Sequence, residues 1–545
     1  MPSRMLQMPF DDSEQIFSYE ARLHIDEHVE KLLNAFGNLS GHIERRLFVD
    51  LQLNKNINEL KSLYLKDFQI TARHFNAIHV QVGGKIASIK EKRKVDIKEL
   101  EEKINGLNKT IEKLKKRSSH AYKAHQKSRR LGFLKEKLAN LKSDHEKGIV
   151  RLCFGSKRLF RAQFNLDSAG YSNHEEWQEE WRFVRSNHFF LLGSKEESHG
   201  NQSCTATVSE EEDISLRIRL PDAFLPLNEN NKYLVLSGIR FKYGHKDIIE
   251  SIKACEERKR LKQAGSEQYK EAGVAISFRF KRDSKSWRVF VSCPKKKPLC
   301  TTSSNKGVIG VDINANHLAI CETDRFGNPI EKISLPLNTY GKDPSQSKAL
   351  IGNACALLIN QAKEKGKSIV IEELEFLKKR ANLRENGDAR YSRMLSSFAY
   401  SFIIQSIKFK AWKEGVSVAK INPAFTSVIG RIKFSRRYGL TIHQAAALSI
   451  GRRHLGVSEK VPRHLEAIPD GKGDHVALSL PVRNRDKHVW SQWGVIKKRL
   501  LVALAAHARA RKSRSSSAKP TLEIGPSQAL PVESWHANPS ELLFV

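Results

Sequence analysis

The chain is poor in cysteine, in long apolar runs and, relative to its basic residues, in acidic ones. Its 545 residues include seven cysteines and no Cys-x-x-Cys pair, which argues against a disulfide framework and against an ordinary zinc site. No apolar run reaches the roughly 18 residues of a membrane-spanning helix, and residues 1–11 show no secretory signal. We therefore expect a soluble, cytoplasmic protein with no membrane partner and no bound zinc.

Basic residues are in large excess. The chain has 94 lysines and arginines against 60 aspartates and glutamates, which gives a formal net charge of +34 and a pI near 9.8. So many positively charged side chains repel one another, and binding to a polyanion offsets that repulsion. The composition therefore favours nucleic acid as the partner. At about 150 residues per domain, the length predicts three or four domains.

Residues 1–148 begin as a strand and continue as helices. Ile16 to Ile25 alternates apolar and polar residues, so residues 1–28 are assigned to a sheet and residues 29–148 to a helical lobe. Two runs of Leu and Ile at steps of three and four predict an antiparallel coiled hairpin joined near Arg117 to His125. Its outer cations predict an arm that faces phosphates, although a solvated face explains any single run of charge. These cations are Lys90, Lys92, Arg93, Lys94, Lys115, Lys116, Arg117, Lys127, Arg129 and Arg130.

Residues 149–305 are rich in short β-type runs separated by turn residues, which predicts an antiparallel barrel or sandwich. The runs are Val150–Phe154, Cys204–Val208, Ile214–Leu220, Tyr233–Phe241, Val274–Phe280 and Trp287–Val291.

Cations stand next to aromatic residues in the first part of this region. Lys157 and Arg158 lie in a predicted turn, and Trp181 and Arg182 lie on a predicted helix. This combination suits a surface that stacks bases and contacts phosphates. Burial in a core explains the aromatic residues about equally well.

Residues 306–508 follow a different pattern. Three successive strands are predicted at 308–312, 317–323 and 330–335, and helices then alternate with strands up to a helix that begins near His443. This order is expected for an RNase H-type α/β domain. Residues 509–545 are basic and rich in Ser and Pro, and they are predicted to be a disordered tail.

Two carboxylates end apolar strands of this domain. Asp312 ends the first strand, and Glu372 ends the strand predicted at 368–371. If the two strands are parallel neighbours, the two acids meet, and converging carboxylates are what Mg²⁺ ions need in a two-metal phosphodiester site. Turns also tolerate acids at strand ends, but the joint occurrence of the two favours a catalytic and metal-binding role.

The motifs around these acids resemble the RuvC nuclease domain of TnpB, the transposon-associated, RNA-guided nuclease family related to the type V CRISPR effectors. The similarity covers about residues 306–456 and is carried by four segments. They are Gly310-Val311-Asp312, Ile369-Val370-Ile371-Glu372, Arg393 to Phe398 and Ile421-Asn422-Pro423-Ala424-Phe425-Thr426-Ser427. The resemblance implies a guide RNA, a target DNA, two Mg²⁺ ions with Mn²⁺ as a substitute, and a β wedge domain interrupted by a helical recognition lobe.

The sequence departs from the family at two places. The Cys-x-x-Cys pairs of a zinc ribbon, which usually follow the segment ending in Ser427, are absent, and so is the third RuvC aspartate. His443 is the only obvious substitute, and Ala446 occupies the position of an Asp found in bacterial RuvC resolvases. His443 either binds a metal, positions a water or is a structural residue at a helix start.

Nearby acids are the alternative source of the missing charge. Glu373 follows Glu372 but belongs to the opposite face of the strand, which makes it the weaker candidate. The stronger candidates are Glu375, Glu385 and Asp388. The cations expected to contact nucleic acid in this domain are Lys378, Lys379, Arg380, Arg393, Arg431, Lys433, Arg436 and Arg437.

Three functions follow as hypotheses. The leading one is an RNA-guided DNA endonuclease of a prokaryotic cytoplasm, acting at the nucleoid, in which the guide reads sequence and the RuvC site cuts. The second keeps guide and target but has lost cleavage with the third ligand. The third is a guide-independent nuclease that assists transposition. Asp312 and Glu372 favour an enzyme, whereas His443 and Ala446 favour the binder.

Overall fold

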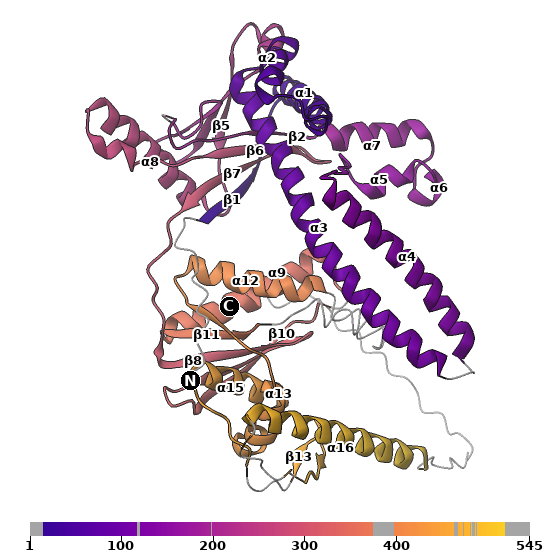
Figure 1. Cartoon of the computed structure of the whole chain (residues 1–545). Coiled ribbons are helices and arrows are strands. Elements are labelled where there is room, and N and C mark those ends of the chain that lie inside the picture. The colour runs from indigo at the N-terminus through magenta and orange to yellow at the C-terminus, as the bar shows by residue number, and fades with distance from the viewer. Residues whose placement is uncertain are drawn as a thin grey trace, which may run out of the picture. The chain divides into compact units, whose positions relative to one another are not determined.

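The computed structural model describes residues 15–116, 120–197, 199–339, 341–373, 397–462, 467–471, 473–479, 481, 486 and 488–517. The chain forms two compact units, which are described separately (Figure 1). The first consists of Met1–Ser303, Leu337–Ser368 and Glu373–Lys420, and the second of Ser304–Pro336, Ile369–Glu372 and Ile421–Val545.

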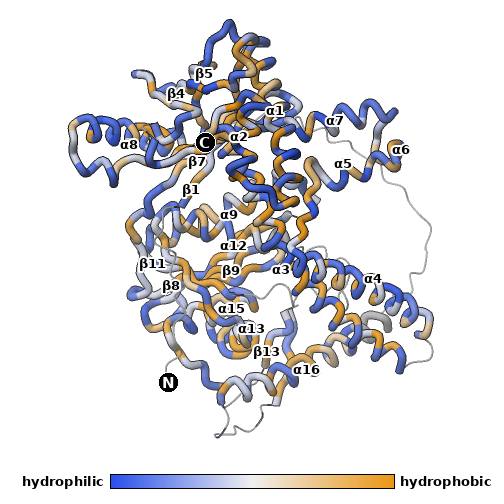
Figure 2. Tube along the Cα trace, turned by 45° about the horizontal axis from the view of Figure 1, so that its top comes forward, coloured by the Kyte–Doolittle hydropathy of each residue, from blue (hydrophilic) through white to orange (hydrophobic). Residues whose placement is uncertain are grey.

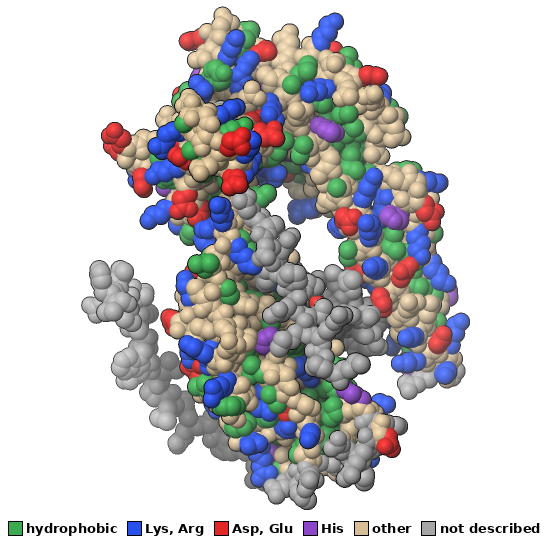
Figure 3. Space-filling view, turned by 60° about the vertical axis from the view of Figure 1, so that its left-hand side comes forward, with side chains coloured by type: hydrophobic (Ala, Val, Ile, Leu, Met, Phe, Trp, Pro, Cys, Tyr) green, Lys and Arg blue, Asp and Glu red, His purple; other side chains and the backbone are tan. Residues whose placement is uncertain are grey.

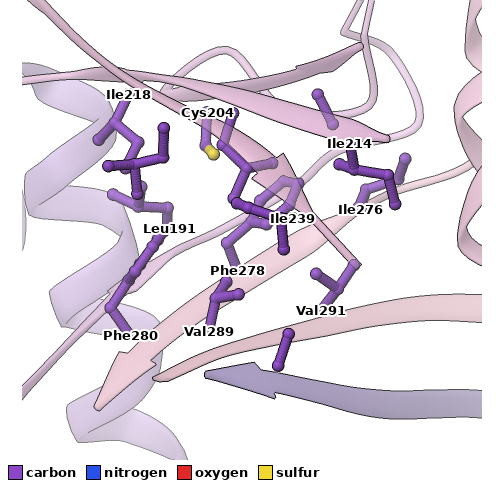
Figure 4. Close-up of a cluster of buried hydrophobic side chains, with 14 of the residues drawn as sticks. Leu191, Cys204, Ile214, Ile218, Ile239, Ile276, Phe278, Phe280, Val289 and Val291 are labelled. Carbon is purple, nitrogen blue, oxygen red and sulfur yellow. The ribbon is translucent and has the colours of Figure 1, made fainter. Parts of the chain in front are cut away.

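Two antiparallel sheets form the β part of the first unit. One has the order β1-β7-β6-β2 and the other β3-β4-β5. The strands are β1 (Gln15–Arg22), β2 (His188–Leu191), β3 (Cys204–Val208), β4 (Ile214–Arg219), β5 (Tyr233–Ile239), β6 (Ser277–Arg282) and β7 (Trp287–Lys295). Their alternating apolar faces share one core, in which Leu191, Phe278 and Val289 of the first sheet pack with Cys204, Ile214 and Ile239 of the second (Figure 4). The predicted antiparallel β layers are present, and β1 joins them from the start of the chain.

The helical lobe follows β1. It consists of α1 (Glu27–Gln52), α2 (Ile57–Phe68), α3 (Ala72–Lys115) and α4 (Ala121–Glu146). α3 and α4 lie side by side as the predicted hairpin (Figure 1), with Leu100, Ile104 and Leu107 buried along the seam. Arg93, predicted to lie on the outer face, is instead 5% exposed and donates to the carbonyl oxygens of Asp144 and Ile149. It therefore ties the base of the hairpin together.

Two predictions for residues 149–305 are wrong. Val150–Phe154 is not a strand, because it has no strand partner and the Val150 amide donates to the Gln52 side chain instead. The region also contains helices. One covers Trp181 and Arg182, as predicted, whereas the β interpretation missed another whose apolar residues Ile248, Ile252 and Cys255 recur at helical spacing. The helices are α5 (Lys157–Ala162), α6 (Leu166–Ala169), α7 (His174–Ser186) and α8 (His245–Gln263), with short 3₁₀ turns η2 (Asp222–Asn228) and η3 (Glu267–Lys270).

A five-stranded sheet of order β10-β9-β8-β11-β12 follows in the chain. Its first three strands form an antiparallel meander, as predicted. The strands are β8 (Ser303–Ile313), β9 (His317–Thr323), β10 (Pro329–Pro336), β11 (Lys367–Glu372) and β12 (Val418–Ile421). α9 (Pro344–Glu364), capped by Asp343, precedes β11, and α12 (Ser397–Lys413) precedes β12. Counted from β8, the sheet order is 3-2-1-4-5: a meander of three strands, followed by two strands that each come after a helix.

Short helices and one long helix complete the second unit. They are α13 (Thr426–Ile429), the π-helical turn η4 (Gly430–Phe434), α14 (Ser435–Tyr438), α15 (Ile442–His454) and α16 (Val489–Ser517), with a small hairpin of β13 (Ile468–Pro469) and β14 (His475–Val476). Apolar residues gather along β9, α13 and α15 (Figure 2). A Cβ at Gly310 of β8 would lie 2.1 Å from the Ala447 carbonyl oxygen, so α15 approaches β8 as closely as a glycine allows.

The predicted disordered tail begins too early. Residues 509–517 belong to α16, because the helical sequence that starts at Val489 continues through them. Among the described helices, none combines the length and the apolarity needed to cross a bilayer.

Candidate functional site

Asp312 lies near the end of β8 and faces α15. Its side chain is 13% exposed, and its Oδ2 lies 3.0 Å from Nδ1 of His443, the second residue of α15. Thr441 and Gln444 form a capping box that fixes the start of this helix. The Asn314 side-chain amide also donates to Oδ2 of Asp312, at 3.0 Å. The residue proposed from sequence as a substitute for the third acid is therefore a direct partner of the first acid.

A second histidine, His317, belongs to the same cluster and was missed from the sequence. It begins β9, and its ring meets that of His443 edge to face, with centroids 4.9 Å apart. Burial lowers the pKa of His317, the neighbouring His443 lowers it further, and Asp312 acts in the opposite direction. The β8–β9 turn is the signal that could have found it, since a tight turn brings His317 opposite Asn314, two residues beyond Asp312.

Glu372, the last residue of β11, has different neighbours. β11 is next to β8 in the sheet, so the two acids end adjacent strands. The Thr426 hydroxyl donates to Oε1 of Glu372. The Glu372 charge also acts on Arg453 of α15. Burial lowers the pKa of Arg453, whereas the charges of Glu372 and Glu459 raise it.

A complete metal site is not assembled from these side chains. Asp312 and Glu372 supply the oxygen ligands that Mg²⁺ prefers. Within the part of the chain that the structure describes, no group of three or more His, Cys, Asp or Glu side chains is arranged to hold a metal ion. The described residues alone therefore form no complete metal site.

The alternative acids Glu375, Glu385 and Asp388 lie outside the described residues, and so do Lys378, Lys379, Arg380 and Arg393. Glu373 is described and exposed, and its Oε1 lies 3.7 Å from Nζ of Lys420. It is thus paired with a lysine of β12.

No family model matches the chain, and no curated protein matches it. Among solved structures, Thermus thermophilus RuvC in complex with a Holliday junction substrate is similar over 27% of this chain and 92% of its own, at 14% identity and a TM-score of 0.20. A CRISPR-Cas12f ternary complex is similar over 80% of this chain and 98% of its own, at 13% identity and a TM-score of 0.19.

The predicted nucleic-acid residues near α5 and α7 are partly exposed. Lys157, Arg158 and Arg182 are exposed, whereas Trp181 is half-buried and stacks on the buried Trp177 with centroids 5.8 Å apart. Phe160 and Phe164, which follow Lys157 on and after α5, are 45% and 75% exposed. Core packing therefore accounts for Trp177, and the Phe160 ring lies 6.0 Å from the rings of both Phe164 and Trp181.

The basic residues after Ser427 divide into two kinds. Lys433 forms an ion pair with the buried Glu459, which also pairs with Arg452, and Arg431 is largely buried, which lowers its pKa. Arg436 and Arg437 are exposed. Arg431 and Lys433, both predicted to contact nucleic acid, are partly buried, because the apolar segment Ile429 to Phe434 turns this stretch towards the core. On the face shown in Figure 3, Lys and Arg side chains outnumber Asp and Glu.

Proposed function

We propose that the chain is a RuvC-type nuclease that cleaves DNA under the direction of a guide RNA. One observation carries the proposal: Asp312 and Glu372 end the neighbouring strands β8 and β11, and α15 brings His443 to Asp312. Support also comes from the RNase H-type strand order and from the net charge of +34, which suits long phosphate backbones.

The proposed chemistry assigns a role to each side chain. Asp312 and Glu372 would hold Mg²⁺ or Mn²⁺, which when bound activates a water and stabilises the leaving oxygen of a phosphodiester. The Asp312 carboxylate orients the His443 ring through Nδ1, and an imidazole held in this way offers Nε2 to a water or a phosphate. Zinc has no role in this proposal.

The remaining regions are proposed to hold the nucleic acids. Residues 1–28 and 149–305 would form the wedge domain, residues 29–148 the recognition lobe, and residues 306–508 the nuclease domain. The guide–target duplex would be bound through its backbone rather than its bases. Association with a transposon belongs to the same proposal.

The test begins with RNA that copurifies with the chain. This RNA is sequenced, and the complex is incubated with a target library of randomised flanks in Mg²⁺ or Mn²⁺. We expect one defined RNA and cleavage of matched DNA beside a short flanking motif. Random RNA that moderate salt removes without loss of activity would contradict guidance.

One observation favours a second candidate, an RNA-guided DNA binder that does not cut. The position of the third acid is occupied by His443 and by the buried Ala446, and the described residues form no three-ligand group. Guide-dependent binding without cleavage, in either metal, would select this candidate.

A further inference from the structure

The segment Asn422-Pro423-Ala424-Phe425-Thr426 contains a backbone conformation that needs an explanation. Phe425 has φ 64° and ψ 5°, in the left-handed region. Bulky side chains rarely adopt this region, and such residues gather at functional sites. The turn joins β12 to α13, which starts at Thr426.

This turn buries the Thr426 hydroxyl next to Glu372. Thr426 is 1% exposed, and its Oγ1 donates to Oε1 of Glu372. The Pro423 carbonyl oxygen is a second acceptor, 3.1 Å from the same Oγ1. A hydroxyl has one hydrogen, so it serves one of these acceptors at a time. A hydrogen bond to an ionised carboxylate is the stronger of the two.

Arg453 and Trp490 hold the turn in place. A guanidinium nitrogen of Arg453 donates to the Asn422 carbonyl oxygen, and the Arg453 guanidinium lies 5.6 Å from the centroid of the Trp490 ring. The Phe425 ring packs edge to face on the same tryptophan, with centroids 6.3 Å apart. The strained residue therefore has packing partners that compensate for its conformation, and the hydroxyl that follows it has a fixed position.

We propose that Thr426 is a positioning residue that holds the Glu372 carboxylate in the orientation used by the candidate nuclease site. The left-handed turn at Phe425 places the hydroxyl, and the hydroxyl places the carboxylate. This inference rests on the proposed function for its consequence in cleavage. The contact between Thr426 and Glu372 can be tested without it.

The first test is a double-mutant cycle in the free energy of unfolding, measured by urea denaturation of the full chain in EDTA. The variants are Thr426→Val, Glu372→Ala and the pair. We expect Thr426→Val to change the unfolding equilibrium constant at least about tenfold more in the wild-type background than in the Glu372→Ala background, because a hydrogen bond to a charged group is lost only in the former. Equal effects in both backgrounds would overturn the proposal and leave Pro423 as the only partner.

Thr323→Val is the matched control. Thr323 is fully buried, and its hydroxyl donates to the Val308 carbonyl oxygen at 3.1 Å. Its effect is expected to be the same with and without Glu372→Ala. If Thr323→Val and Glu372→Ala are coupled as strongly as Thr426→Val and Glu372→Ala, the cycle reports a general destabilisation of the fold rather than a specific contact. The proposal would then fail.

The second test is cleavage of guide-matched DNA. Thr426→Val is expected to lower the rate by about 10- to 100-fold, as the loss of a group that orients a metal ligand does, and Thr426→Ser is expected to restore it. Failure of Ser to restore it would contradict the hydroxyl's role. If the wild type does not cut while the unfolding cycle shows coupling, the proposed function fails and the positioning contact remains.

Discussion

Asp312 and Glu372 end adjacent strands, yet their surroundings differ. Asp312 is bound by the side chains of His443, which is 48% exposed, and of Asn314. Glu372 accepts from Thr426, which is 1% exposed, at a turn that Arg453 and Trp490 hold. One acid thus has a solvent-facing partner that substrate can reach, and the other has a buried partner that fixes it.

This difference shows that similar positions in a sheet do not imply similar roles. A carboxylate with an exposed imidazole partner can exchange that partner for water, metal or phosphate at small cost. A carboxylate with a buried hydroxyl partner keeps its orientation, because releasing it would leave a buried donor unsatisfied. We therefore expect substitutions near Asp312 to change the chemistry and substitutions near Glu372 to change geometry and stability.

The largest expected effect is the loss of either acid. Asp312→Ala and Glu372→Ala should each reduce cleavage of matched DNA below about 1% of wild type, because each removes a metal ligand. Nucleic-acid affinity should be nearly unchanged, because neither residue is a phosphate-contacting cation. Cleavage and gel-shift assays on the same preparations measure both quantities. Wild-type cleavage by either variant would refute the assignment.

The partner of Asp312 gives the next largest effect. His443→Ala should lower cleavage by about 10- to 100-fold. If His443 instead binds a metal in place of the third acid, His443→Asp should keep or raise cleavage, and wild-type activity should be higher in Mn²⁺ than in Mg²⁺ because imidazole favours the former. Rates measured across metal concentrations test this. If His443→Ala cuts normally, His443 is a structural helix-start residue and Glu375, Glu385 or Asp388 becomes the next candidate.

The same contrast between buried and exposed partners extends to the cations. Lys433→Ala should destabilise the second unit by about 1.5 kcal/mol, because it removes one of the two cations that pair with the buried Glu459, and should leave nucleic-acid affinity unchanged. A variant with Lys115, Lys116, Lys123 and Arg129 of the hairpin changed to Ala should have unchanged stability. In a plot of the logarithm of the binding constant against the logarithm of the salt concentration, this variant should give a shallower slope. The difference should be about 0.9 for each duplex phosphate that the variant no longer neutralises. A loss of nucleic-acid affinity in Lys433→Ala, or a loss of stability in the hairpin variant, would contradict this contrast.

The smallest expected effect concerns a buried histidine. Burial lowers the pKa of His74 to about 4, whereas an unfolded chain binds that proton near pH 6.5. Since the unfolded state takes up the proton first, stability is full above about pH 6.5 and falls by about 2 kcal/mol as the pH drops to about 5. His74→Gln, which can still donate to the Arg219 carbonyl oxygen, should reduce this slope in urea titrations between about pH 7 and 4. An unchanged slope would show that other groups cause the acid sensitivity.

Local patterns predicted the elements of the site well. Apolar runs placed Asp312 near the end of β8 and Glu372 at the end of β11, and the start of α15 was found near His443. Contacts between distant segments were not predictable. Nothing near Lys433 in the sequence indicates that Glu459 neutralises it, and nothing near Thr426 indicates its bond to Glu372. Val150–Phe154 resembled a strand but had no neighbour to pair with.

If the two unlike acids hold metal as one site, removing either one must abolish the same binding event. Calorimetric titration of Mn²⁺ into the chain bound to guide and matched DNA measures this, with wild type, Asp312→Ala and Glu372→Ala compared. We expect the wild type to bind Mn²⁺ and each variant to lose that binding. Binding that persists unchanged in either variant, or a wild type that binds no Mn²⁺, would contradict a shared site.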